Sequence, residues 1–84
     1  MPVTVNLPAS LSHFAGPSVV VRESVANLGQ LVAALDRLAP GIARELDDPL
    51  YNFAINQEIF LHSVDSRPVG DGDVVEIIPS IAGG

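Results

Sequence analysis

One segment of the sequence, residues 27–38, has the pattern of an amphipathic helix, and it restricts the folds open to this chain. Its apolar residues recur every three or four positions and form one stripe: Leu28, Leu31, Val32, Leu35 and Leu38. Asn27 is a favourable N-cap, and Gln30 stands three positions on, as in a capping box. Pro40-Gly41 then stops the helix. Because one apolar stripe needs one apolar surface, the pattern predicts a single main helix that covers one face of a sheet.

Five short segments on either side of this helix have the composition of β-strands, with alternating apolar and polar residues or many β-branched side chains. The predicted strands are residues 3–7, 18–23, 51–55, 59–61 and 74–78. Asn56-Gln57 supplies a turn between the third and fourth of them, and Asp71-Gly72 supplies the turn before the last. Residues 42–46 are expected to form a short helical turn. The order of strand, strand, helix and three strands predicts an α+β domain.

The composition of the chain indicates one domain and excludes several classes of function. Its 84 residues are 48% hydrophobic and 17% charged, which is typical of a packed globule. Four basic residues against ten acidic ones give a net charge of −6, which argues against nucleic acid and anionic membranes as partners and favours a basic groove. The absence of cysteine excludes disulfides, thiolate catalysis and cysteine-based zinc sites. Without a leader or a membrane-spanning run, the sequence predicts a soluble cytoplasmic protein.

The last residues, 80–84, are predicted to form a flexible tail on a folded domain of residues 1–79. Pro79 has no amide hydrogen for the ladder, so the final strand should end there. Beyond it the tail tapers to residues without side chains: Ile81, Ala82, Gly83 and Gly84. Five extended residues reach roughly 17 Å, far enough to enter the active site of another protein, and glycine passes a narrow tunnel without a Cβ clash. The alternative interpretation is a frayed end without a function.

The segments "NQEIF" and "GDGDVVEIIPSIAGG", together with the order of the elements, resemble the MoaD/ThiS family of ubiquitin-like sulfur-carrier proteins. The resemblance implies a β-grasp fold, in which a mixed sheet wraps around one main helix. It also places Val75 and Ile77 inside the domain. Val74 stands where the family commonly has a polar residue, so it either enlarges an apolar docking patch or packs against a neighbour.

The resemblance further implies that the carboxylate of Gly84 is the reactive group. A partner activating enzyme would adenylate it with MgATP, and a sulfur donor would then convert it to a thiocarboxylate. Gly83 would be the thin neck behind it, and the implied partner contacts are Ile78, Pro79, Ile81 and Ala82. The chain would then be a protein cosubstrate, the non-catalytic small subunit of a complex with a sulfur-accepting large subunit. It would bind no cofactor itself, and it contains no nucleotide-binding motif.

The remaining polar residues do not form a candidate metal or catalytic site. His13 and His62 are far apart in the sequence and lack companions at ligand spacing. The Asp-Gly-Asp at residues 71–73 leads directly into a strand, whereas a calcium-binding EF-hand needs a 12-residue loop, so this motif favours a turn. A cluster of acidic residues is interpreted as a solvated face, with docking as the minority interpretation: Glu45, Asp47 and Asp48.

The sequence leaves the pathway open. Asn56-Gln57 and the chain length favour a carrier of the type found as the small subunit of molybdopterin synthase, which serves molybdenum cofactor biosynthesis. Carriers for thiamine, cysteine or specialised metabolites fit the same pattern. Outside this class, the alternatives are a ubiquitin-like modifier joined to lysines of target proteins and a binding module with an inert tail.

Overall fold

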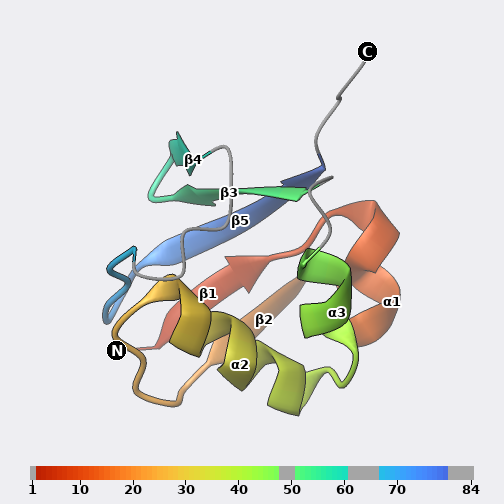
Figure 1. Cartoon of the computed structure of the whole chain (residues 1–84), viewed down its shortest axis with the longest axis horizontal. Helices are drawn as coiled ribbons and strands as arrows, with labels where there is room; N and C mark the ends of the chain where they lie inside the picture. The colour runs from red at the N-terminus through yellow and green to blue at the C-terminus, as the bar shows by residue number, and fades with distance from the viewer. Residues whose placement is uncertain (1, 48–50, 61–66, 80–84) are drawn as a thin grey trace.

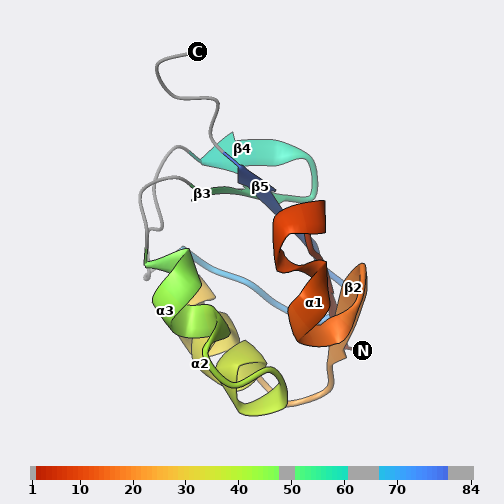
Figure 2. The same cartoon turned by 90° about the vertical axis from the view of Figure 1, so that its right-hand side faces the viewer.

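A five-stranded mixed sheet, with α2 and α3 on one face, forms the frame of the molecule (Figures 1 and 2). The computed structural model describes residues 2–47, 51–60 and 67–79. Its strands are β1 (Val3–Asn6), β2 (Ser18–Val21), β3 (Tyr51–Ile55), β4 (Glu58–Phe60) and β5 (Val74–Pro79). The order across the sheet is β2-β1-β5-β3-β4. Only β1 and β5 pair in parallel among these neighbours, so the strand that leads into the C-terminal residues lies at the centre of the sheet.

The helices are short apart from the predicted main helix, and the helical turn predicted for residues 42–46 is confirmed as a short helix. They are η1 (Ala9–Leu11), α1 (Ser12–Ala15), α2 (Leu28–Leu38) and α3 (Ile42–Leu46). Helix α2 begins at its predicted cap, where the Asn27 side chain accepts a hydrogen bond from the Gln30 amide at 2.8 Å. The Gln30 side chain accepts from the Ala26 amide at 2.8 Å, one residue before the cap, so the capping box is one position wider than expected. None of the described helices is long and apolar enough to cross a membrane.

The core lies between α2 and the sheet. Leu28, Leu31 and Leu35 are each 1% exposed and confirm three positions of the predicted stripe. The prediction for Leu38 is wrong, because 56% of this residue is exposed. Leu38 belongs to the last turn of α2 and lines a groove beside β2, beyond which the described residues place no further strand to cover it.

The central strand β5 alternates as the family resemblance implied. Val75 and Ile77 are buried against the helices, whereas Val74 is exposed and Ile78 is half-buried. Pro79 is the last residue of the strand and is paired with Tyr51, so the strand runs one residue further than the predicted range 74–78. Because proline has no amide hydrogen, it can close a ladder but does not continue one.

The two predicted turns have the backbone geometry that their residues favour. Asn56 and Gln57 join β3 to β4 with φ angles of 50° and 74°, and two consecutive left-handed residues are typical of a tight hairpin turn. Gly72 has a φ of 81° in the turn before β5. Strand β2 ends at Val21, two residues before the predicted end, and the helices η1 and α1 were not predicted.

Candidate functional site

The base of the C-terminal tail is held by the middle of the sheet. Strand β5 pairs with β1 on one side and β3 on the other, and Pro79 is the last residue that the structure describes. The hydroxyl groups of its partner Tyr51 and of Ser10 share a hydrogen bond at 3.0 Å. This bond joins β3 to η1 beside the end of β5. The predicted site residues Ile81, Ala82, Gly83 and Gly84 lie outside the described residues.

The start of β5 is anchored to the β3–β4 turn by one side chain. The Asn56 side-chain oxygen accepts from the Val74 amide at 2.9 Å, and its side-chain nitrogen donates to the Asp73 carboxylate at 3.0 Å. The Asn56 backbone amide also donates to the Val74 carbonyl at 2.8 Å. Asn56 therefore ties β5 to β3 at the end opposite Pro79, so the strand is fixed at both ends.

The Asp73 carboxylate completes this anchor. Hydrogen bonds from the Asn56 side chain and from the Gly70 amide, the latter at 2.8 Å, lower the pKa of Asp73 below its ordinary value of 3.8, against a smaller opposing effect of burial. The sequence predicted turns at both places but not the contact between them. Asn56 and Asp73 are 17 residues apart, and turn propensity says nothing about which turns meet.

The face of the sheet that points away from α2, called here the outer face, carries both apolar and polar residues. Its apolar residues include Val20, Ile59, Val74 and Ile78, and its polar residues include Thr4, Asn6, Asn52 and Glu76. Val20 and Val74 lie in one row across the sheet on either side of Thr4, and they are 42% and 40% exposed. Exposure of Val74 favours the first of the two interpretations of this residue, in which it enlarges an apolar surface rather than packing into the core.

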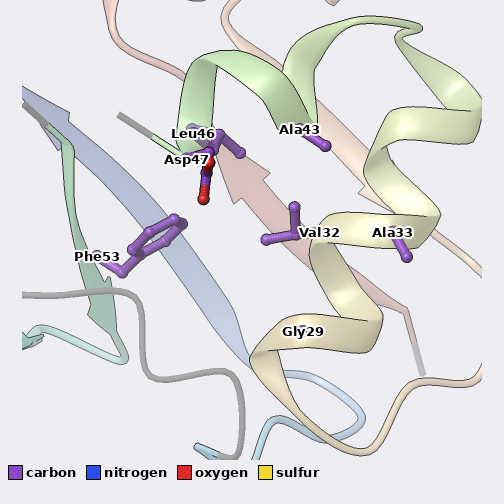
Figure 3. A pocket seen from close by; sticks show the side chains of 7 residues that line it. All are labelled: Gly29, Val32, Ala33, Ala43, Leu46, Asp47 and Phe53. Atoms are coloured by element: carbon purple, nitrogen blue, oxygen red, sulfur yellow. The ribbon is translucent and has the colours of Figure 1, made fainter. Parts of the chain in front are cut away.

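A hollow of about 230 Å³ lies between α2, α3 and β3, and Figure 3 shows it from close by. It is lined by Gly29, Val32, Ala33, Ala43, Leu46, Asp47 and Phe53. In Figure 3 the side chains of Val32 and Asp47 point into it, with the Phe53 ring opposite. Asp47 is the only ionisable residue among those seven, so they offer no acid and base pair for catalysis.

Among the described residues, the other candidates from the sequence do not lie together in one site. The His13 ring packs on the Phe14 ring with centroids 4.4 Å apart. His62 and Asp48 lie outside the described residues, and Glu45 and Asp47 are exposed on α3 and just after it. Within the described ranges, no group of three or more His, Cys, Asp or Glu side chains is placed to hold a metal ion.

Comparison with known proteins gives matches over the whole domain. The sulfur carrier protein CysO of Mycobacterium tuberculosis is 32% identical over an alignment of 96 positions that covers both chains completely. The crystal structure of M. tuberculosis CysO superposes with a TM-score of 0.80 at 29% identity, over 94% of this chain and 99% of that one. A chain in the crystal structure of the Amycolatopsis orientalis BexX/CysO complex gives 0.79 at 27% identity, over 98% and 99%.

A more distant structure shares the fold alone. It is a putative molybdopterin converting factor, subunit 1, from Pyrococcus furiosus, with a TM-score of 0.75 at 20% identity, over 96% of this chain and 99% of that one. The mixed sheet around one main helix, shared by all these structures, defines a ubiquitin-like β-grasp protein.

The ThiS family model matches residues 5–84, and the chain therefore belongs to the ThiS family. This assignment and the CysO match support sulfur carrier function. Sulfur carriers are small ubiquitin-like proteins that are not catalysts themselves and that work with partner enzymes; one relative forms the BexX/CysO complex.

Proposed function

We propose that this protein carries sulfur as a thiocarboxylate on Gly84. The observation that carries the proposal is the ThiS family match, which extends to the terminal Gly-Gly at the end of the chain. The fold supports it, because the residues of the tail follow directly from β5, the most enclosed strand of the sheet. A strand held on both sides gives the tail a fixed starting point, from which a short extended segment can reach into a partner.

The chemistry proposed for Gly84 needs an activating partner. A carboxylate resists nucleophilic attack because its oxygen is a poor leaving group. The partner would join the Gly84 carboxylate to AMP from MgATP and release pyrophosphate. A donor of sulfur at the oxidation level of sulfide would then attack the acyl carbon, forming a C–S bond while the C–O bond to AMP breaks, so that sulfur takes the place of one oxygen. In this scheme the chain is a cosubstrate: the acceptor enzyme passes the sulfur from Gly84 to its substrate, and hydrolysis by water restores the carboxylate.

The neighbours of Gly84 would position it without reacting. Gly83 has no side chain, so its backbone fits a narrow channel. The proposed contacts with the activating enzyme and the acceptor are Ile78, Pro79, Ile81 and Ala82. Of these, the described part of the chain includes Ile78, which is half-buried, and Pro79, which is exposed. Both lie at the point where β5 ends, as the proposal requires.

We propose that this chain is a carrier of the CysO type, whose sulfur acceptor belongs to cysteine biosynthesis, the cysteine alternative from the sequence. The CysO match has 32% identity over the full length of both chains. The molybdopterin assignment, which the sequence placed first, has no comparable support, because the likeness to the Pyrococcus protein at 20% identity concerns the fold alone. Cytoplasmic location stays a prediction.

Two variants test the carboxylate proposal, with the wild-type chain as the reference. Deletion of Gly84, or addition of one residue after it, moves the reactive carboxylate while leaving the domain unchanged. We expect both variants to unfold at the wild-type urea concentration and to lose ATP-pyrophosphate exchange with the activating enzyme. Normal exchange by either variant would show that the position of the carboxylate is not what the enzyme recognises.

A further inference from the structure

Strand β2 forms one edge of the sheet and pairs only with β1 among the described strands (Figure 2). The Leu7 amide donates to the Pro17 carbonyl at 2.8 Å in the continuation of this antiparallel pairing. Hydrogen-bonded and non-hydrogen-bonded residue pairs alternate along an antiparallel ladder, and Leu7 with Pro17 is a hydrogen-bonded pair. Counting from it, the pairs of Val19 and Val21 with β1 are also hydrogen-bonded, so these two residues direct their backbone groups toward β1. Ser18 and Val20 therefore direct their amide and carbonyl groups away from the sheet. Both residues are exposed, so these groups are available to another strand.

An apolar groove runs beside this edge, between β2 and the last turn of α2. It has a volume of about 390 Å³ and is lined by Val20, Val21, Arg22, Glu23, Arg37 and Leu38. Leu38 and Val20 are two of the four large apolar residues that stand exposed among those described. A strand added at this edge would have an apolar neighbour on each of its two faces. Val20 would contact it on the outer face of the sheet, and Leu38 on the face that carries α2.

The charges of the groove differ from those of the whole chain. The chain has four arginines and a net charge of −6, and two of these arginines, Arg22 and Arg37, line the groove. Arg37 forms an ion pair with Glu23, whereas the described residues provide no ion pair for Arg22. The groove therefore favours an acidic segment at the Arg22 end. A second copy of this chain would bring another charge of −6, which opposes pairing of two β2 edges.

We propose that the β2 edge and this groove bind an extended segment of a partner protein, with consecutive apolar residues followed by acidic ones, as an additional strand of the sheet. The backbone groups of Ser18 and Val20 would provide the hydrogen bonds, Val20 and Leu38 the apolar contacts, and Arg22 the charge contact. Val20 lies in the same row as Val74, and Pro79 lies five residues further along β5, roughly 17 Å away along the strand direction. The segment thus binds away from the base of the tail, and the proposal does not depend on Gly84 chemistry.

The test uses the full chain and a defined probe, the acetylated and amidated peptide Val-Ile-Val-Ile-Asp-Glu-Glu, in an NMR titration. We expect chemical shift changes at Ser18, Val20 and Leu38, and weaker binding at higher salt. A peptide with lysine in place of its acidic residues should bind at least about tenfold more weakly.

Variants then separate the backbone contacts from the charge contact. Val20→Pro removes an amide hydrogen that points away from β1, so the sheet keeps its own bonds while affinity should fall at least about tenfold. Arg22→Glu should weaken binding by a similar factor, and it keeps the test valid if the proline variant does not fold. Ile59→Ser, at an exposed apolar residue of β4, is the matched control and should bind as the wild type does.

Absence of binding at millimolar peptide, or equal affinity of wild type and Arg22→Glu, would overturn the proposal. It would also be overturned if the chain alone dimerised through β2, because the occupant would then be a second copy. Failure of this test leaves Gly84 activation unaffected, since Val20→Pro should still support ATP-pyrophosphate exchange.

Discussion

Replacement of Asn56 by glycine tests whether this side chain anchors the start of β5. Glycine accepts the φ of 50° without strain, so Asn56→Gly removes the side-chain bonds and keeps the turn geometry. The bond to the Val74 amide contributes about 0.5 to 1.5 kcal/mol. The exposed bond to Asp73 adds at most a few tenths of a kcal/mol after solvent screening. We therefore expect the free energy of unfolding to fall by about 0.5 to 2 kcal/mol.

The neighbouring residue provides the control. Gln57 has a φ of 74° in the same turn, is exposed, and makes no side-chain hydrogen bond to the other described residues. Gln57→Gly should therefore change the free energy of unfolding by less than about 0.5 kcal/mol in urea titrations followed by circular dichroism. Hydrogen exchange at the Val74 amide should become faster only in Asn56→Gly. Equal destabilisation by the two variants would refute the anchoring role of Asn56.

Two further predictions concern the core and the response to acid. Leu35→Ala should reduce the free energy of unfolding by about 2 to 5 kcal/mol because Leu35 is buried. Leu38→Ala, at an exposed position, should change it by less than about 0.5 kcal/mol. Similar losses for the two variants in urea titrations would contradict the packing described for α2. Because the pKa of Asp73 is lowered in the folded state, its charged form stabilises the fold above the ordinary pKa of 3.8, and this contribution is lost as the pH falls through the lowered value. The stability difference between wild type and Asp73→Asn should therefore be full at neutral pH and shrink as the pH falls below 3.8. A difference that grows in acid would reverse the assigned direction of the pKa shift.

Local patterns in the sequence predicted the elements but not the way they meet. The cap at Asn27 and the turn at Asn56-Gln57 depend on neighbouring residues alone, and the structure confirms both. Exposure of Leu38 depends on where α2 ends relative to the edge of the sheet, and helical periodicity does not contain that information. The bond between Asn56 and Asp73 likewise needs the strand order, which brings two turns together across 17 residues.

In the candidate site, too, the sequence predicted the local elements but not their arrangement. The sequence predicted that a strand would end near Pro79 and carry a tapered tail, and the structure confirms the strand. Its place at the centre of the sheet, between β1 and β3, could not be predicted from periodicity, because a period of two is the same in central and edge strands. The roles of Ile81, Ala82, Gly83 and Gly84 stay predictions, since those residues lie outside the described ranges.

The measurement that most directly tests the account is the intact mass of the protein after incubation with its activating enzyme, MgATP and a sulfur donor. We predict a species in which sulfur replaces one oxygen, located at Gly84 by fragmentation, and its disappearance when the acceptor enzyme and its substrate are added. The Gly84 deletion variant should show no such species. Recovery of the protein mainly as isopeptide conjugates to target lysines, without a thiocarboxylate at any sulfur supply, would contradict the carrier function and favour a protein modifier.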